Sequence, residues 1–358
     1  MPRVWKVAVI GGGIGRSHIA EGYARLRDRF DLQVLCDLDK ERLAEVGDEF
    51  AVPRRTTSFD EVLAMGDIDI IDICTPPTLH FPQAIAALAA GKQVICEKPL
   101  VGSLAEIDQL TAAEAKANGR VMPVFQYRFG NGLQKAKRII DSGLAGKPYL
   151  ATVETAWLRG AKYYSVPWRG LWASELGGAL LTHAIHSHDI LTYLMGNVAS
   201  VFARTATRVN PIEVEDCAVA NLEMESGALA ALAVTLGSAK EISRLRLCFE
   251  HVTFESSLAP YSPGDDPWQI VPTSPEAEAR FAEALKGWRP VASRFEGLMA
   301  SYHQALETAG PLPVTLADAR RSLELITALY HAAESGEAVA LPIGRSHPKY
   351  GSWRPQHV

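Results

Sequence analysis

The chain has 358 residues, 47% of them hydrophobic and 22% charged, which is enough apolar sequence for two cores and excludes a disordered protein. Its 36 basic and 41 acidic residues give a net charge of −5, and no basic block of the kind that binds phosphate backbones is present, so nucleic acid is not an expected partner. No apolar run reaches bilayer length and no leader-like segment precedes the first predicted strand, so we expect a cytoplasmic protein without a membrane partner.

The first 125 residues alternate short apolar runs with segments of helical period, which is typical of βαβ units on a parallel sheet. Nearly continuous apolar runs predict strands buried on both faces, at 4–10, 32–36, 68–74, 93–96 and 121–125. Asp39 and Ser58 are predicted helix caps, and Ser103 with Glu106 predicts a capping box for a helix reaching residue 119. We therefore predict a doubly wound α/β Rossmann domain over residues 1–125.

The pattern changes after residue 125, where a second domain is expected over residues 126–358. Helices are predicted at 132–142, 178–195, 276–286, 292–308 and 316–335, and strands at 149–158, 198–209, 217–224, 228–236 and 242–249. Short turns such as Glu225-Ser226-Gly227 predict antiparallel pairing of consecutive strands, and residues 260–275 are predicted to be a loop. The C-terminal helices are candidates to pack back on the first domain.

A glycine run follows the first strand. Closely spaced glycines before a helix leave backbone N–H groups open to a pyrophosphate, so Gly11, Gly13, Ile14 and Gly15 are candidate dinucleotide contacts. The spacing is one residue shorter than G-x-G-x-x-G, and an ordinary strand-to-helix turn is the alternative. Asp37 ends the second strand, where a carboxylate binds ribose hydroxyls and repels a 2′-phosphate, so NAD is favoured over NADP, although Arg16 and Arg42 keep NADP open.

Two further strand ends carry candidate residues. Thr75, Pro76 and His80 follow the strand at 68–74, as cofactor contacts or as a plain turn stiffened by prolines. Glu97 and Lys98 follow the strand at 93–96, and a partly desolvated lysine there can exchange a proton with a substrate hydroxyl near the nicotinamide. The alternative for Lys98 is a solvated surface lysine.

A histidine cluster lies in the predicted helix 178–195. Thr182, His186 and Asp189 are spaced to share one helical face, and His186 is the candidate general acid/base. His183 is a candidate substrate contact, with a core or surface histidine as the alternative. His188 is expected to be a core or surface histidine, and the spacing does not form a convincing metal site. The five cysteines lack CxxC spacing and are expected to be reduced thiols.

Together these motifs resemble the Gfo/Idh/MocA oxidoreductase family, which includes glucose-fructose oxidoreductase and inositol 2-dehydrogenase. The resemblance is carried by the glycine loop with Ser17-His18, Thr75-Pro76, Glu97-Lys98-Pro99-Leu100, Gln126-Tyr127-Arg128-Phe129, Trp168-Arg169, and Gly177-Gly178 through His186 and Asp189. It implies a C-terminal α+β domain with a large, mostly antiparallel open sheet whose back face forms homodimers or homotetramers. It also implies that Lys98 holds the substrate hydroxyl, that His186 accepts its proton, and that Arg169 contacts cofactor or substrate.

Two features depart from the family pattern. One is the shortened glycine loop, and the other is the residue four before the histidine, which is usually Asp, less often Asn, and is Thr182 in this chain. A hydroxyl can only hydrogen-bond, so the third catalytic position is open. The expected activity is NAD-dependent oxidation of a secondary hydroxyl of a sugar, sugar derivative or cyclitol. Its expected substrate contacts are Lys98, Gln126, Arg128, Tyr163, Trp168, Trp172, His183 and His186; packing is the alternative for the aromatic ones. An NAD-retaining glycosidase and a non-catalytic sugar-sensing regulator are the other candidate functions.

Overall fold

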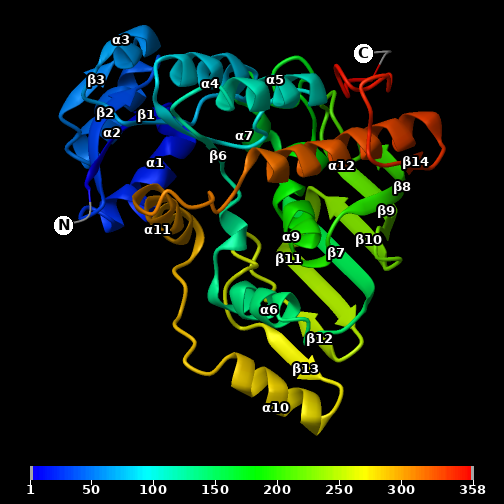
Figure 1. Ribbon diagram of the computed structural model, residues 1–358. Coiled ribbons are helices and arrows are strands. Elements are labelled where there is room, and N and C mark those ends of the chain that lie inside the picture. Colours follow the sequence, from blue (N-terminus) through cyan, green and yellow to red (C-terminus); the bar gives the residue numbers. More distant parts are fainter. Residues whose placement is uncertain (1–2, 356–358) are drawn as a thin grey trace. The chain divides into compact units, whose positions relative to one another are not determined.

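The computed structural model describes residues 3–355 and divides into two compact units (Figure 1). The first unit contains the chain up to Phe125 together with Phe295–Arg320. The second unit contains Gln126–Arg294 and the chain from Arg321 onward. Each unit has its own sheet, and the chain passes between the units more than once.

The first unit is built on a six-stranded parallel sheet of order β3-β2-β1-β4-β5-β6. The doubly wound α/β prediction is thereby confirmed. Its strand order reverses between β1 and β4, where ligands bind in such sheets. The strands are β1 (Trp5–Ile10), β2 (Phe30–Cys36), β3 (Arg54–Thr56), β4 (Ile70–Ile73), β5 (Gln93–Cys96) and β6 (Val121–Pro123).

The helices of this unit begin where the sequence places capping residues. Asp39 accepts hydrogen bonds from Glu41 N and Arg42 N, Ser58 accepts one from Glu61 N, and Ser103 accepts one from Glu106 N. The Glu106 carboxylate accepts from Gly102 N instead of the Ser103 N–H of a capping box. The helices are α1 (Gly12–Glu21), η1 (Tyr23–Arg25), α2 (Lys40–Glu49), α3 (Phe59–Ala64), η2 (Pro77–Leu79), α4 (His80–Ala89) and α5 (Leu104–Glu114).

Helix α11 (Arg294–Glu307) comes late in the chain but packs within the first unit. Its Phe295 ring lies 4.5 Å from the ring of His18, and its His303 ring lies 5.5 Å from Phe30. The residues that follow are also fixed there, because the Arg120 guanidinium donates to the carbonyl of Gly310 at 2.6 Å. Helix α11 therefore completes the core of the first unit.

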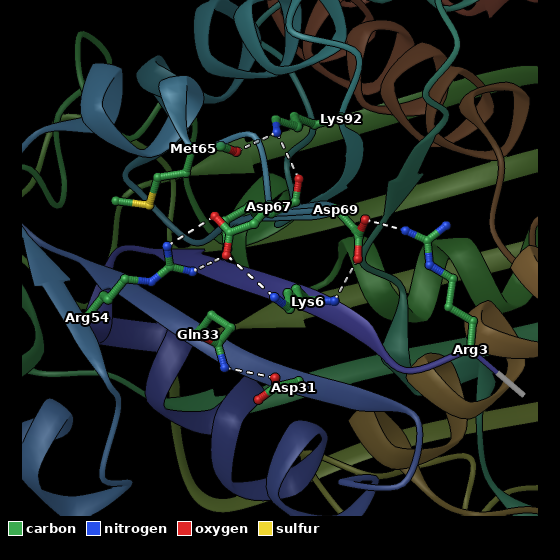
Figure 2. Close-up of polar contacts among 10 residues, drawn as sticks. Arg3, Lys6, Asp31, Gln33, Arg54, Met65, Asp67, Asp69 and Lys92 are labelled. Atoms are coloured by element: carbon green, nitrogen blue, oxygen red, sulfur yellow. Dashed lines mark hydrogen bonds and ion pairs between the residues drawn. The ribbon is translucent and has the colours of Figure 1, made fainter.

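Paired charges line the amino end of the parallel sheet (Figure 2). The Asp67 carboxylate lies within ion-pair distance of both Lys6 and Arg54. Lys92, which is 7% exposed, donates to the carbonyls of Met65 and Ile68, both at 2.8 Å. Lys92 thus bonds two backbone carbonyls, and Asp67 pairs with two cations. We assign these side chains at the amino end of the sheet a structural role.

The second unit contains an eight-stranded sheet of order β13-β12-β11-β7-β10-β9-β8-β14, antiparallel except for the parallel pair β10 and β7. The expected α+β class is confirmed. Antiparallel pairing of all consecutive strands was wrong, because β7 lies between β10 and β11. The strands are β7 (Pro148–Leu158), β8 (Val198–Ala206), β9 (Cys217–Met224), β10 (Leu229–Thr235), β11 (Gly237–Phe249), β12 (Val252–Glu255), β13 (Gln269–Pro272) and β14 (Val339–Ala340).

The predicted helix 178–195 is two helices, α8 (Ala179–Thr182) and α9 (Ile185–Met195). Thr182 and His186 therefore do not share one continuous helical face, and that part of the prediction was wrong. The predicted loop 260–275 contains β13. The other elements are η3 (Gln126–Arg128), α6 (Asn131–Asp141), α7 (Ala161–Tyr164), α10 (Pro275–Ala284) and α12 (Leu316–Ser335).

The start of α8 rests on one buried carboxylate. Glu215 accepts hydrogen bonds from Gly178 N at 3.1 Å and Leu180 N at 2.9 Å, and the Tyr330 hydroxyl donates to it at 3.0 Å. A Cβ atom on Gly178 would lie 1.9 Å from the carbonyl oxygen of Glu215, so only glycine fits. Burial raises the pKa of Glu215 to about 7, although these three hydrogen bonds oppose the shift.

Within residues 3–355, the longest apolar helical stretch falls short of what a membrane crossing needs.

Replacing Gly22 with alanine tests the packing of α11. The new Cβ would meet the Met299 sulfur at 2.1 Å and the His18 carbonyl at 2.7 Å, so the buried Met299 side chain of α11 and the turn after α1 must both shift. We expect the free energy of unfolding to fall by roughly 1–3 kcal/mol, measured by urea denaturation. Gly66→Ala is the control, because nothing lies within 4 Å of its added Cβ. Equal stability of the two variants would contradict this packing.

Glu215 predicts how stability depends on pH. Its folded-state pKa lies above the unfolded value, so as pH rises from about 4.5 to about 7 the unfolded chain loses the proton first and stability falls. Between pH 5 and pH 8 the free energy of unfolding of the wild type should fall by up to about 3 kcal/mol more than that of Glu215→Gln. Urea denaturation at both pH values measures the two changes. Exposed Glu337→Gln is the control and should follow the wild type. Parallel losses in wild type and Glu215→Gln would refute this role.

Candidate functional site

The glycine loop joins β1 to α1, and its glycines have different roles. Gly11 has φ of 99°, and a Cβ there would lie 2.6 Å from the carbonyl oxygen of Cys74, so both conformation and space require glycine. A Cβ on Gly15 would lie 2.7 Å from the Val9 side chain, so Gly15 allows α1 to approach the strand. Gly13 and Ile14 are exposed, and a Cβ on Gly13 would meet nothing within 4 Å. The open part of the loop is thus Gly13-Ile14.

Asp37 at the end of β2 closes the other side of this loop. One carboxylate oxygen accepts a hydrogen bond from Gly12 N at 2.6 Å, and the other accepts one from Asp39 N at 2.8 Å. The Arg42 guanidinium lies 3.3 Å from the first oxygen. The sequence prediction missed Gly12, although it lies between Gly11 and Gly13 in the glycine run. Its backbone N–H donates to the Asp37 carboxylate of the protein itself.

The loop after β4 is braced by His80. Its Nδ1 lies 2.7 Å from the carbonyl oxygen of Pro99, and its Nε2 lies 2.7 Å from that of Thr75. Burial lowers the pKa of His80, although both carbonyls oppose that shift. Both ring nitrogens lie at hydrogen-bond distance from backbone carbonyls, and the neutral ring donates to one of them. His80 thus packs between the Thr75-Pro76 turn and the segment that carries Lys98.

Lys98 follows β5, one strand away from the reversal of strand order. Its backbone N–H donates to the Glu97 carboxylate at 2.9 Å, and its side chain is half-buried. Burial would raise the pKa of Glu97, but the His18 ring and the positive charge of Lys98 lower it, so Glu97 is a carboxylate. The first unit thus brings the glycine loop, Asp37 and Lys98 to the same edge of its sheet.

His186 lies in the first turn of α9 in the second unit and is buried. The Tyr127 ring stacks on it with centroids 4.3 Å apart and planes 23° apart. Arg128 makes two hydrogen bonds to Asp189 of α9, at 2.7 and 2.6 Å, and this pair is almost fully buried. The segment Gln126–Arg128 therefore fixes the helix that carries His186.

The Thr182 hydroxyl is directed at the neighbouring residue. It donates to the Gly178 carbonyl at 2.8 Å and lies 2.7 Å from His183 Nδ1. Because its single proton goes to the carbonyl, His183 Nδ1–H is the donor in the second bond, and Nε2 of neutral His183 is the acceptor nitrogen. Thr182 thus orients His183.

Arg169 contacts two aromatic side chains of the second unit. Its guanidinium lies 4.0 Å from the centroid of Tyr163 and 4.3 Å from that of Trp168, and the Tyr163 ring lies 5.4 Å from His183. Trp172 is separate: it is 5% exposed, its indole N–H donates to the Glu213 carbonyl, and its ring contacts Tyr330. Arg169, Tyr163, Trp168 and His183 therefore form one cluster of contacts. Trp172 packs against Tyr330 instead.

Comparison with known proteins identifies both units. Residues 5–125 match the oxidoreductase family with an NAD-binding Rossmann fold, and residues 133–255 match the GFO/IDH/MocA C-terminal domain. The predicted family and the NAD cofactor are thereby confirmed.

Two curated relatives and one solved structure are similar to the chain. The myo-inositol 2-dehydrogenase of Thermotoga maritima is 30% identical over 63% of the chain and 66% of that protein, so the chain spans just under two thirds of its length. The D-apiose dehydrogenase of Rhizobium rhizogenes is 25% identical over 86% of the chain and 89% of that protein. The WlbA dehydrogenase of Bordetella pertussis, crystallised with NADH and UDP-GlcNAcA, superposes with a TM-score of 0.83 at 29% identity, covering 96% of the chain and all of that structure.

The two family matches cover most of the chain and correspond to its two units, each with the predicted class of sheet. The chain belongs to the Gfo/Idh/MocA family of oxidoreductases.

Proposed function

We propose that this chain is an NAD-dependent dehydrogenase that oxidises a secondary hydroxyl of a sugar, sugar derivative or cyclitol. The observation that carries the proposal is the placement of Lys98 at the carboxyl end of β5, on the same sheet edge as an NAD-binding glycine loop. Relatives that act on myo-inositol and D-apiose, and one crystallised with a nucleotide sugar, support a polyhydroxylated substrate.

The residues of the loop fit NAD. The first-turn N–H groups of Gly13 and Ile14 have no intrahelical partners and lie at an exposed helix start, where a pyrophosphate would bind. Asp37 would accept hydrogen bonds from the ribose hydroxyls, and Thr75 and Pro76 follow β4 at the same carboxyl edge of the sheet. When bound, the nicotinamide accepts the hydride.

The two arginines that kept NADP open are already engaged. Arg42 contacts the carboxylates of Asp37 and Asp39, at 3.3 and 2.9 Å. Arg16 contacts those of Glu45 and Glu49, at 3.4 and 2.9 Å. With their charges balanced and the Asp37 carboxylate at the ribose position, both arginines are poor ligands for a 2′-phosphate, which favours NAD.

Lys98 and His186 are proposed to remove the hydroxyl proton as hydride leaves the carbon. Lysine holds the hydroxyl oxygen as a donor, and the neutral imidazole accepts the proton. Tyr127 fixes the plane of His186 by stacking. Thr182 replaces the usual carboxylate and contributes through His183, whose Nε2 we assign to a substrate hydroxyl.

The remaining predicted substrate residues divide into contacts and supports. Arg169, Tyr163 and Trp168 offer a guanidinium and aromatic faces, which suit a sugar ring with polar substituents. Gln126, which is 6% exposed, is a candidate hydrogen-bonding partner. Arg128 and Trp172 are held by Asp189 and Glu213, so we assign them supporting roles.

We also propose that the chain forms homodimers or homotetramers through the exposed face of its large sheet. Alternate residues of β9 and β10 point to the core, and the others leave Val219 58% exposed and Leu229 56% exposed. Phe202 and Leu150 add to this face on β8 and β7.

We propose the reducing cytoplasm as the compartment of this protein. Its free cysteines agree with that proposal; they are Cys36, Cys74, Cys96, Cys217 and Cys248.

The activity is tested by NAD reduction across inositols, aldoses, glycosides and sugar acids. Lys98→Ala and His186→Asn should each lower kcat/KM by roughly 10²–10⁴, because each removes a group that moves the proton. Exposed Lys116→Ala is the matched control and should retain activity. NADH binding, followed by fluorescence, should persist in all variants. Equal turnover by wild type and Lys98→Ala would overturn the proposal, and glycoside cleavage without net NADH formation would favour the glycosidase.

The oligomer is tested by placing charge on the sheet face. The double variant Val219→Lys/Leu229→Lys should dissociate to monomers in analytical ultracentrifugation, because buried unpaired ammonium groups are costly. Val4→Lys, on a 45% exposed residue of the other unit, is the control and should keep the wild-type mass. An unchanged sedimentation coefficient in the double variant would contradict this interface.

A further inference from the structure

His18 on α1 lies between two buried carboxylates. Its Nδ1 is 2.8 Å from an oxygen of Asp72, and its Nε2 is 3.0 Å from an oxygen of Glu97. His18 and Asp72 are fully buried, and Glu97 is 5% exposed. A neutral imidazole has only one N–H, so two carboxylate acceptors are satisfied together only by the imidazolium.

The surroundings agree with a charged ring. Burial alone would lower the pKa of His18, but the charge of Asp72 and the contact with Cys74 raise it well above the ordinary value. The Tyr23 hydroxyl of η1 also donates to Asp72, at 2.8 Å, and Cys74 lies 3.5 Å from Nδ1. From α11, the Phe295 ring covers the imidazole, and the Tyr302 hydroxyl lies in the same core.

The cluster is connected to Lys98. The Glu97 oxygen that His18 does not contact accepts the backbone N–H of Lys98 at 2.9 Å. A continuous series of hydrogen bonds therefore runs from Asp72 through His18 and Glu97 to the lysine backbone. Both oxygens of Glu97 are held, so its orientation is fixed.

His18, Asp72 and Cys74 are also close enough to share a metal ion. The donor chemistry does not fit one, because a metal ligand must be a deprotonated nitrogen and both nitrogens of His18 face carboxylates at hydrogen-bond distance. Burial raises the pKa of the Cys74 thiol, which keeps it protonated and a poor ligand.

We propose that His18 is a positioning residue for Lys98: its imidazolium holds the Glu97 carboxylate on the lysine backbone and balances the buried charges of Asp72 and Glu97. The inference rests on the proposed function, in which Lys98 contacts the substrate. The charges of His18 and Lys98 offset those of Asp72 and Glu97. Removing the His18 charge leaves an uncompensated carboxylate near Lys98, and removing the Glu97 charge leaves an uncompensated cation.

The charge balance predicts opposite effects of two substitutions. His18→Gln should raise the pKa of the Lys98 amine and Glu97→Gln should lower it, each by about one unit, since a nearby charge moves a pKa by roughly one to three. The double variant should return near the wild-type value. His80, which borders Lys98 through Pro99, is unchanged in all of them.

The measurement is the pH titration of dimethylated lysines in the whole protein after reductive methylation with 13C-formaldehyde, followed by NMR. The Lys98 signal is assigned by its loss in Lys98→Arg. His303→Gln is the matched control, since it removes another buried imidazole of the first unit, bonded to the Arg3 carbonyl and unconnected with Glu97 by any described hydrogen bond. It should leave the Lys98 titration unchanged.

Stability and turnover complete the test. If His18→Gln lowers the melting temperature but leaves the Lys98 titration unmoved, as His303→Gln does, His18 is merely structural and the inference fails. If His18→Gln does not fold, Glu97→Gln alone decides: an unmoved titration overturns the inference. If the titrations shift in opposite directions but Lys98→Ala turns over normally, the charge link stands and the proposed function fails.

Discussion

Two carboxylates buried on either side of one imidazole constrain the whole first unit. Burying an uncompensated carboxylate costs several kcal/mol, so Asp72 and Glu97 are tolerated in the core only while His18 lies between them. Because these residues come from β4, from the end of β5 and from α1, satisfying them fixes the helix behind the glycine loop against two neighbouring strand ends. The position of the Lys98 backbone follows from the same contacts.

The second unit also contains a buried ion pair, formed by Arg128 and Asp189. Arg128 and Asp189 are both buried and bond through two parallel hydrogen bonds, so α9 cannot rotate without separating them. The stacked Tyr127 adds a flat surface for His186. These contacts hold the helix that carries His186, while the hydroxyl of Thr182, where the family usually has a carboxylate, lies against His183.

Local sequence predicted the parallel sheet because its strands are buried on both faces and are therefore continuously apolar. It missed β3, whose Arg54–Thr56 carry polar side chains at a sheet edge. Helix caps such as Ser103 were predictable because a cap bonds to residues three positions away. The candidate site residues were named from their types and positions and stay predictions, whereas their hydrogen-bond partners were not predictable from the sequence. Neither the contact of Gly12 with Asp37 nor that of Thr182 with His183 has a local signal.

Contacts between distant segments account for the other differences. The parallel pairing of β10 with β7 has no signal in the short turns around it, and the start of α8 is held by Glu215, which lies far along the chain. The return of α11 to the first unit also depends on pairings such as Phe295 with His18. Period and capping report on neighbours in sequence, so they do not reach such contacts.

The late position of α11 has a consequence for synthesis on the ribosome. The first unit includes Phe295–Arg320, so its core cannot be completed until strands β7 to β13 of the second unit have been made. The sheet of the second unit, encoded almost entirely before that point, can form earlier. The nascent chain therefore does not complete its two units in the order in which they begin, and Phe30 is synthesised long before His303 of α11, the ring that packs against it.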